Sequence, residues 1–321
     1  MTQNSLKDAL WIFSHSSPQI IPSYVVSGIM PANILGIKKL IYLTNDDPQK
    51  TLDLYRPKTI IISKVFHRGV LAFVEQAKKQ GVKVISIFDD WNFDKSSKTD
   101  NTLINLPLAK ISDLIIVKTQ VASEVLKKNT DLNSIVIPDM TRFKAAPASW
   151  NIDDPPKLIW FGMQSNHDSL IQQLEDIDCL TFKTKLKIVT NFSNELKSFL
   201  NSKYKKIEIE IIEWHPNFNI EISNSNIVII PYPKDKERLV KSSNRIIDSM
   251  NLGRFVVLSD VVQFSEFRNF SYFGNIAKGV DWAVNNKNQI KNFVLSAQKY
   301  VSENYSQEVV AKMWQKIIEK I

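Results

Sequence analysis

The sequence predicts an α/β protein in which helices cover both faces of parallel β-sheets. Short runs of β-branched and other apolar residues recur along the chain, and stretches with helical spacing of apolar residues separate them. This alternation is typical of a doubly wound parallel sheet, because parallel strands need a crossover between them. The 321 residues also suffice for two domains of about 150 residues each.

Six apolar runs predict the strands of the first domain. They are short and rich in isoleucine and valine, as buried parallel strands are. The predicted strands are residues 9–13, 39–43, 59–63, 82–88, 113–117 and 134–137. The predicted helices are residues 32–39, 69–80 and 103–111. Gly81 directly follows the second of these helices, where a glycine commonly ends one.

The second domain repeats the pattern after a junction rich in alanine and proline, at residues 145–148 and 153–156. The predicted strands are residues 157–161, 185–189, 207–211, 227–230 and 255–258. A predicted helix covers residues 170–177, and a final amphipathic helix begins at Ser306. We expect that helix to pack within the molecule. The predicted domains are residues 1–148, residues 149–296 and a C-terminal helix at 297–321.

Composition excludes several kinds of site. Cys179 is the only cysteine, so the chain has no internal disulfide and no zinc site built from cysteines. The four histidines lack ligand spacing, and we expect neither a metal nor a cofactor. There is no G-x-G-x-x-G motif, which argues against a nicotinamide or flavin site.

The positive charge is concentrated in the first half. Residues 1–150 carry 19 Lys and Arg against 13 Asp and Glu, which gives +6 of the total formal charge of +8. A basic first half suits an anionic lipid or glycan, whereas the dispersed lysines argue against nucleic acid. Residues 9–37 carry no charged side chain, but prolines interrupt them, so we expect a buried strand and loop rather than a membrane segment. We expect a cytoplasmic protein, with at most peripheral contact at the inner face of the membrane.

Parallel sheets bind ligands beyond the carboxyl ends of their strands. In the first domain residues 64–68 follow one predicted strand, and Asp89 and Asp90 follow the next. Adjacent carboxylates that face one site raise each other's pKa, which suits proton transfer, although aspartates also favour turns. Ser27 and Gly28 precede a predicted helix, where small residues let a ligand approach the backbone; a simple turn explains them equally well.

The most informative stretch is residues 226–259. A strand stopped by Pro231 leads through a charged loop to Lys241, and Ser242 or Ser243 is suited to cap the helix that follows. The N-terminus of a helix offers free backbone N–H groups and the positive end of the helix dipole, so it is a natural seat for phosphate.

Two polar residues of that helix, Asn244 and Asp248, are four positions apart and share one face. The Asp248 carboxylate could accept hydrogen bonds from a sugar diol. The alternative is an ordinary strand–helix–strand unit in which Arg245 pairs locally with Asp248.

The segment KSSNRIIDSMNLGRFVV, residues 241–257, resembles the donor site of GT-B fold glycosyltransferases, in particular the GT4-like group (glycosyltransferase group 1). There a strand ending in proline leads to a helix N-terminus that holds the diphosphate. The segments FDDWNFD, LAKISDLIIVKTQVASEVL, IVIPDM and NYSQEVVAKMW resemble other parts of the same fold. The resemblance implies two Rossmann-like domains facing a cleft, with C-terminal helices crossing back to the first domain.

The resemblance also implies roles for residues of the donor domain. Asp248 stands where an acidic residue binds the nucleotide ribose, and Val240 stands where the family usually has a glutamate. The loop after Gly162, a second candidate phosphate edge, has no arginine or lysine. Lys241 and Arg245 would therefore carry the charge that faces the diphosphate.

For the first domain, the resemblance places Asp89 where many members have a histidine near the donor sugar and acceptor, and Asp90 at the neighbouring aspartate. The loop with Ser27 and Gly28 corresponds to one that reaches the donor phosphates. Trp214, in the second domain, follows a strand where the family contacts the nucleotide base, and it either stacks there or only packs.

By resemblance, the protein is a hexosyltransferase-type enzyme (EC 2.4) of polysaccharide biosynthesis. It would move a sugar from a nucleoside-diphosphate sugar to a glycan, a lipid-linked acceptor or another cell-surface polysaccharide, with retention of configuration and without a metal. Two alternatives stay open. One is a nucleotide-sugar epimerase on the same fold, and the other is a non-catalytic relative that binds a nucleotide or glycan.

Overall fold

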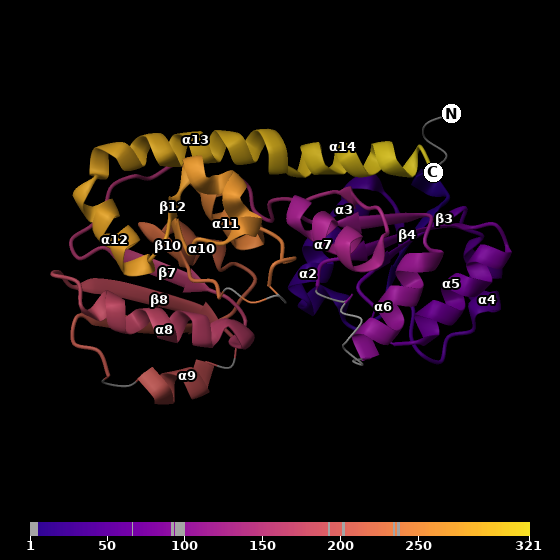
Figure 1. Ribbon diagram of the computed structural model, residues 1–321, viewed down its shortest axis with the longest axis horizontal. Coiled ribbons are helices and arrows are strands. Elements are labelled where there is room, and N and C mark those ends of the chain that lie inside the picture. The colour runs from indigo at the N-terminus through magenta and orange to yellow at the C-terminus, as the bar shows by residue number, and fades with distance from the viewer. Residues whose placement is uncertain are drawn as a thin grey trace. The chain divides into compact units, whose positions relative to one another are not determined.

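The computed structural model describes residues 6–65, 67–90, 93, 100–191, 193–200, 203–233, 235 and 238–321 (Figure 1). These residues form two compact units. Unit 1 takes in the described residues of Met1–Met140, Asp235–Ser242 and Tyr305–Ile321. Unit 2 takes in those of Thr141–Lys234 and Ser243–Asn304. The predicted boundaries after residues 148 and 296 did not foresee that Asp235–Ser242 groups with unit 1.

Unit 1 is built on a six-stranded sheet in which every strand pair is parallel. The strands are β1 (Ala9–Phe13), β2 (Lys38–Ile41), β3 (Thr59–Ser63), β4 (Lys83–Phe88), β5 (Leu114–Val117) and β6 (Ile135–Val136). Their order is β2-β1-β3-β4-β5-β6. β2 lies on one side of β1 and β3 on the other, so the strand order reverses at β1. The prediction of a doubly wound parallel sheet is confirmed.

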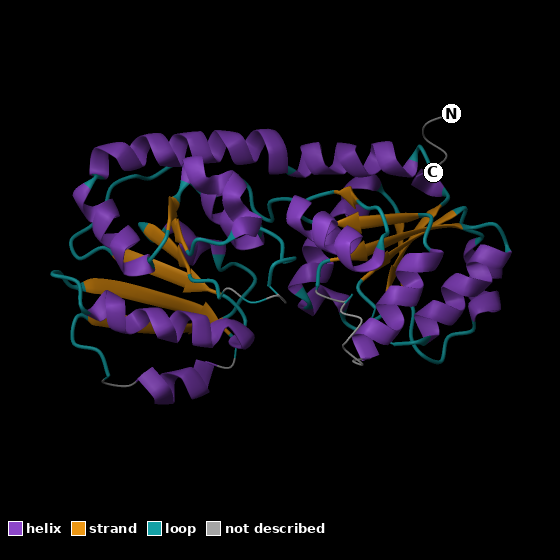
Figure 2. Cartoon of the chain, in the orientation of Figure 1, coloured by secondary structure: helices purple, strands orange, loops and turns teal. Residues whose placement is uncertain are grey.

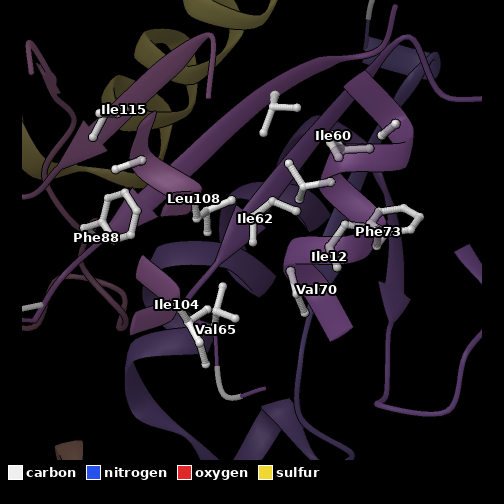
Figure 3. Close-up of a cluster of buried hydrophobic side chains, with 14 of the residues drawn as sticks. Ile12, Ile60, Ile62, Val65, Val70, Phe73, Phe88, Ile104, Leu108 and Ile115 are labelled. Carbon is white, nitrogen blue, oxygen red and sulfur yellow. The ribbon is translucent and has the colours of Figure 1, made fainter. Parts of the chain in front are cut away.

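Alternate residues of the strands of unit 1 enter two hydrophobic cores, as the period of two requires. One core joins Ile12, Ile60 and Ile62 to Phe73 and to helices on that face (Figure 3). These helices are α4 (Pro48–Tyr55), α5 (Gly69–Lys79), α6 (Asp100–Ile111) and α7 (Gln120–Thr130).

The opposite core of unit 1 contains the end of the chain. Helix α14 (Gln307–Ile318) begins at Ser306, whose hydroxyl accepts a hydrogen bond from the N–H of Val309 as the cap prediction required. Its buried Trp314 meets the ring of Trp11 edge-on, with centroids 5.0 Å apart. The predicted return of a C-terminal helix to the first domain is confirmed.

The prediction of a loop at Ser27 and Gly28 is wrong, and the helix predicted at residues 32–39 is present but begins at Met30 and ends at Leu35. Ser27 and Gly28 lie in a π-helical turn (Val25–Ile29) between α2 (Pro22–Tyr24) and α3 (Met30–Leu35). The helical stretch ends at Gly36, whose φ of 67° is left-handed. Gly28 is needed for packing, because a Cβ there would lie 2.6 Å from the ring of Phe13.

Unit 2 also has a six-stranded sheet with parallel neighbours (Figure 2). The strands are β7 (Lys157–Phe161), β8 (Thr184–Thr190), β9 (Ile207–Glu213), β10 (Ile227–Ile230), β11 (Phe255–Leu258) and β12 (Tyr272–Phe273). The order β12-β11-β10-β7-β8-β9 is the Rossmann order, in which the direction reverses between the first strand, β7, and the fourth, β10.

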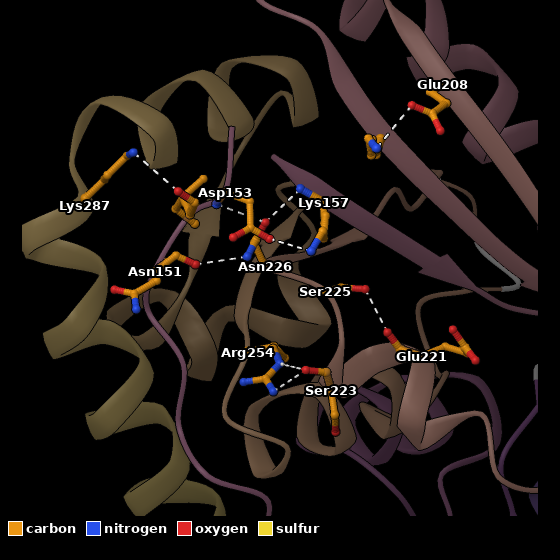
Figure 4. A network of polar contacts seen from close by, with 12 residues as sticks. Asn151, Asp153, Lys157, Glu208, Glu221, Ser223, Ser225, Asn226, Arg254 and Lys287 are labelled. Atoms are coloured by element: carbon orange, nitrogen blue, oxygen red, sulfur yellow. Dashed lines mark hydrogen bonds and ion pairs between the residues drawn. The ribbon is translucent and has the colours of Figure 1, made fainter. Parts of the chain in front are cut away.

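Helices flank the sheet of unit 2. They are α8 (His167–Asp178), α9 (Ser193–Leu200), α10 (Asn219–Ser223), α11 (Asn244–Asn251), α12 (Ile276–Asn285) and α13 (Lys287–Tyr305). Polar contacts join the N-terminal ends of β7 and β10 (Figure 4). The side chain of Asn226 accepts hydrogen bonds from the N–H groups of Lys157 and Asp153 and donates one to the carbonyl of Asn151.

None of the helices formed by described residues combines the length and the hydropathy that a membrane crossing requires.

Candidate functional site

At the strand-order reversal of unit 1, Tyr24 bridges the ends of two neighbouring strands. Its hydroxyl donates a hydrogen bond of 2.5 Å to the carbonyl of Lys64, after β3, and accepts one from the N–H of Ser14, after β1. The side chain of Tyr24 is 0% exposed, and burial raises its pKa to about 12. Tyr24 thus ties together the two strand ends at the position where sheets of this order usually bind ligands.

Lys64 adopts a left-handed backbone conformation, with φ of 35°. Such a conformation is costly for a lysine and persists only where the surroundings hold it. Here the hydroxyls of Tyr24 and Ser14 both donate to the Lys64 carbonyl. The lysine Nζ lies 2.5 Å from an Asp90 carboxylate oxygen, so the strained turn places a cation beside the predicted acid pair.

Asp90 lies between two lysines, because Lys241 contacts its other carboxylate oxygen. Burial alone would raise the pKa of Asp90, but the charges of Lys241 and Lys64 hold it below its ordinary value. Asp89 behaves oppositely: burial and the charge of Asp90 raise its pKa, against the opposing effect of the two lysines. Neighbouring acids whose pKa values are pushed apart are suited to proton transfer.

The structure brings Lys241 to the acid pair of unit 1. Val240, at the position where the resemblance expects a glutamate, is buried in a hydrophobic core of unit 1. The segment that carries both residues therefore packs as part of unit 1. The expectation that Lys241 faces a donor diphosphate stays a prediction, as does any ligand contact of the half-buried Ser242. Trp91, next to the acid pair, lies outside the described residues.

Ser27 is buried, and its hydroxyl donates a 2.8 Å hydrogen bond to Asp139. Asp139 pairs in turn with the buried Lys118 at 3.1 Å. This internal network accounts for Ser27 without a ligand, and the predicted ligand contact of Ser27 and Gly28 stays a prediction.

The strand-order reversal of unit 2 is lined differently, by a glycine and an arginine. Gly162 follows β7, and a Cβ there would lie 2.9 Å from the ring of Trp160 and 3.6 Å from Nη1 of Arg245. The guanidinium of Arg245 lies over the ring of Tyr232, which follows β10, at 5.6 Å from the centroid. Arg245 thus places a cation between the carboxyl ends of the two strands at which this sheet class binds ligands.

The N-terminus of α11 starts at the same edge. Ser243 occupies the N-cap position as predicted, but within the described residues its side chain makes no capping hydrogen bond. The side-chain oxygen of Asn244 is buried and has no hydrogen-bond partner in the part of the chain that the structure describes. A helix end with uncapped N–H groups beside an arginine is suited to an anion.

Asp248 faces an arginine that the sequence analysis missed. Its side chain is 1% exposed, and its two oxygens accept hydrogen bonds from the backbone N–H (2.9 Å) and from Nε (2.5 Å) of Arg142. The predicted contact of Asp248 with a ribose stays a prediction.

Trp214 directly follows β9 and is 42% exposed. Its ring lies 6.2 Å from that of Phe218, which also packs on Phe161 at the end of β7. An exposed ring at this edge is available to a planar ligand, and the predicted stacking on a base stays a prediction.

The fold of the whole chain matches solved glycosyltransferase structures. A glycosyltransferase from Rickettsia africae ESF-5 matches with a TM-score of 0.71 and 14% identity over 97% of each chain. HepE from Anabaena, in complex with UDP and glucose, matches with a TM-score of 0.76 and 9% identity over 98% of this chain and 99% of that one. MurG from Acinetobacter baumannii gives a TM-score of 0.56 and 10% identity over 98% and 99%.

These matches and the two parallel sheets confirm the GT-B fold predicted from the resemblance. No model of a protein family matches the sequence, and no curated protein matches it. Among the described residues, no three or more His, Cys, Asp or Glu side chains are grouped as a metal site would require.

Two charged residues of these sites were not predicted individually. Lys64 belongs to the stretch 64–68 that its position after a strand singled out, but its strained backbone has no sequence signature. Arg142 lies at the start of unit 2, 106 residues before its partner Asp248. No local spacing relates two residues so far apart, so sequence reasoning had no means of pairing them.

Proposed function

We propose that this protein is a glycosyltransferase that transfers a sugar from a nucleoside-diphosphate sugar to a glycan or lipid-linked acceptor. One observation carries the proposal. At the strand-order reversal of unit 2, the uncapped N-terminus of α11, the close-approach glycine Gly162 and the guanidinium of Arg245 lie at one edge of a Rossmann-order sheet.

This edge offers what a nucleoside diphosphate needs. Backbone N–H groups of α11 and the Arg245 guanidinium supply donors and positive charge for the diphosphate, and Gly162 leaves room beside the arginine. A departing nucleoside diphosphate develops negative charge, so the same groups would also lower the barrier to transfer. HepE from Anabaena, which shares the fold, has been solved with UDP and glucose, and we therefore propose a UDP-sugar as the first donor to test.

We assign the acid pair of unit 1 to the acceptor. Asp89, whose pKa burial raises, would exchange a proton with the acceptor hydroxyl, and Asp90 would remain ionised between Lys64 and Lys241. By resemblance to GT4-like enzymes, we propose hexosyl transfer with retention and without a metal. The net positive charge of residues 1–150 favours an anionic or membrane-associated acceptor.

The test is single-turnover consumption of a UDP-sugar with and without a panel of glycan and lipid-linked acceptors. The proposal expects acceptor-dependent release of UDP, strongly reduced in Asp89→Asn and retained in Asp131→Asn, an aspartate at the end of α7 in unit 1. Isomerisation of the donor sugar without acceptor would instead identify an epimerase. Nucleotide binding without any turnover would identify a non-catalytic relative.

A further inference from the structure

We propose that Arg142 binds a phosphate oxygen of the nucleotide, and that Asp248 serves to orient Arg142 rather than to contact the ligand. This inference rests on the proposed function, since it assumes that a nucleotide binds at α11. It reverses the roles implied by the resemblance, in which the acidic residue itself holds the ribose.

The carboxylate of Asp248 has little surface left for a ligand. Both of its oxygens already accept hydrogen bonds from Arg142, and the side chain is 1% exposed. A ribose diol needs accessible acceptor lone pairs, because its hydroxyls act as donors to a carboxylate. In contrast, the Arg142 side chain keeps 16% of its surface exposed, so the arginine is the member of the pair that a ligand can reach.

The guanidinium of Arg142 lies against two aromatic rings. Its central carbon lies 4.9 Å from the ring centroid of Phe218 and 5.3 Å from that of Phe143. Only Nε is used by Asp248, and the two Nη groups make no hydrogen bond to any residue that the structure describes. These groups form the donor fork that binds phosphate oxygens.

The position of Arg142 is fixed relative to α11. The backbone of Arg142 donates to Asp248, and the carbonyl of Phe143 accepts a 2.8 Å hydrogen bond from the side chain of Asn251, one turn further along the helix. Ala146 donates to the carbonyl of the same asparagine at 3.3 Å. The strap of residues 142–146 is thus tied along α11, so a phosphate at the helix would meet a guanidinium that needs little reorganisation.

The charges of the pair are compatible with an anionic ligand. Asp248 neutralises one cation of the site but leaves its N–H donors in place, whereas an unpaired aspartate beside a diphosphate would repel it. The three charged side chains Arg142, Asp248 and Arg245 together keep one net positive charge at this edge of unit 2.

The experiment measures binding of UDP by isothermal titration calorimetry and of uridine by ligand-observed NMR. The variants are Arg142→Lys, Asp248→Asn and, as a matched control in unit 2, Arg268→Lys, whose arginine pairs with Asp260. Arg142→Lys should weaken UDP at least tenfold and leave uridine within twofold, because a lysine keeps the charge but loses the fork. Asp248→Asn should weaken UDP less than Arg142→Lys does and leave uridine within about twofold, because Arg142 keeps its donor fork but loses the carboxylate that orients it. Arg268→Lys should change neither affinity.

Either of two results would overturn the inference: unchanged UDP affinity in Arg142→Lys, or equal losses of UDP and uridine affinity in Asp248→Asn. In both cases UDP binding by the wild type would leave the proposed function standing. Failure of the wild type to bind any nucleoside diphosphate would overturn both. Circular dichroism checks folding. If Arg142→Lys does not fold, the double variant Arg142→Gln/Asp248→Asn removes both charges together and should show the same loss of UDP binding.

Discussion

Both units contain a strand-order reversal, the position at which such sheets bind ligands, but different side chains stand there. Each sheet reverses its strand order beside its first strand, at β1 in unit 1 and at β7 in unit 2. In unit 1 the hydroxyl of the buried Tyr24 bridges the two strand ends. In unit 2 a glycine and an arginine stand there instead. The strand order is therefore similar at the two positions, and the difference between them lies in the side chains that stand there.

The charged groups differ in the same way. Unit 1 collects acids and lysines beyond β3 and β4, where Lys64 and Lys241 bracket Asp90. Unit 2 presents arginines at α11, of which Arg245 lies over an aromatic ring and Arg142 pairs with Asp248. The first arrangement suits proton exchange and the second suits an anionic ligand, which matches the division between acceptor and donor that we propose.

The largest expected effect comes from Tyr24, which bridges the strand ends of unit 1. Tyr24→Ala should lower the free energy of unfolding by about 3–5 kcal/mol, since it removes a fully buried aromatic side chain. Urea unfolding measures the loss. Tyr24→Phe keeps the ring and should cost about 1–3 kcal/mol for the hydrogen bonds. UDP affinity should not change in either variant; a nucleotide that bound better to Tyr24→Ala would contradict the assignment of the two sites.

The next effect concerns Arg245, at the strand-order reversal of unit 2. Arg245→Met should weaken UDP binding by about 1.5–3 kcal/mol, because a charged hydrogen-bond donor is lost. Its stability should fall by only about 0.5–1 kcal/mol, through loss of the cation–π contact with Tyr232. Titration calorimetry and thermal unfolding report the two quantities. Arg268→Met, which also loses a cation–π contact, with Phe273, is the control and should keep UDP affinity.

The smallest effects concern the acid pair. Asp89→Asn and Asp90→Asn should change the free energy of unfolding in opposite directions. Asp90 has a lowered pKa in the folded state, so its ion pairs stabilise the protein above the ordinary aspartate pKa of about 3.9. That stability is lost as the pH falls through the lowered value. Asp90→Asn should therefore cost about 1–3 kcal/mol at pH 7 and progressively less as the pH falls below about 4.

Asp89 has a raised pKa, so its ionised form costs stability as the pH rises from about 4 through the raised value. Asp89→Asn removes this cost and should be more stable than the wild type at pH 8 but not at pH 3. Thermal unfolding across this pH range tests both variants. Two difference curves of the same sign would show that the acids do not divide their charge as we infer.

The sequence predicted the strands well because buried parallel strands are continuous apolar runs. Thr59–Ser63 and Ile227–Ile230 lie where they were predicted. The helical turns at residues 22–29 were missed, because Pro22 and Gly28 are residue types common in turns, whereas here Pro22 begins a helix and Gly28 allows close packing. Local residue types do not reveal such tertiary reasons.

The candidate sites were predicted as far as position along strands and helices allows. Asp89, Asn244 and Arg245 follow from where elements begin and end. The pairing of Asp248 with Arg142 and the contact of Lys241 with Asp90 depend on residues that lie far apart in the sequence. Residue types and spacing along the sequence do not indicate these contacts.

The central claim is that the edge of unit 2 at α11 binds a nucleoside diphosphate. It is tested most directly by the thermal stability of the wild type and of Arg245→Met with UDP, GDP, ADP, CMP and dTDP, because a ligand of the folded state raises its apparent stability. The account predicts an upward shift with at least one nucleoside diphosphate, UDP first, and a much smaller shift in the variant. No shift with any nucleotide in folded wild-type protein, or an equal shift in Arg245→Met, would contradict it.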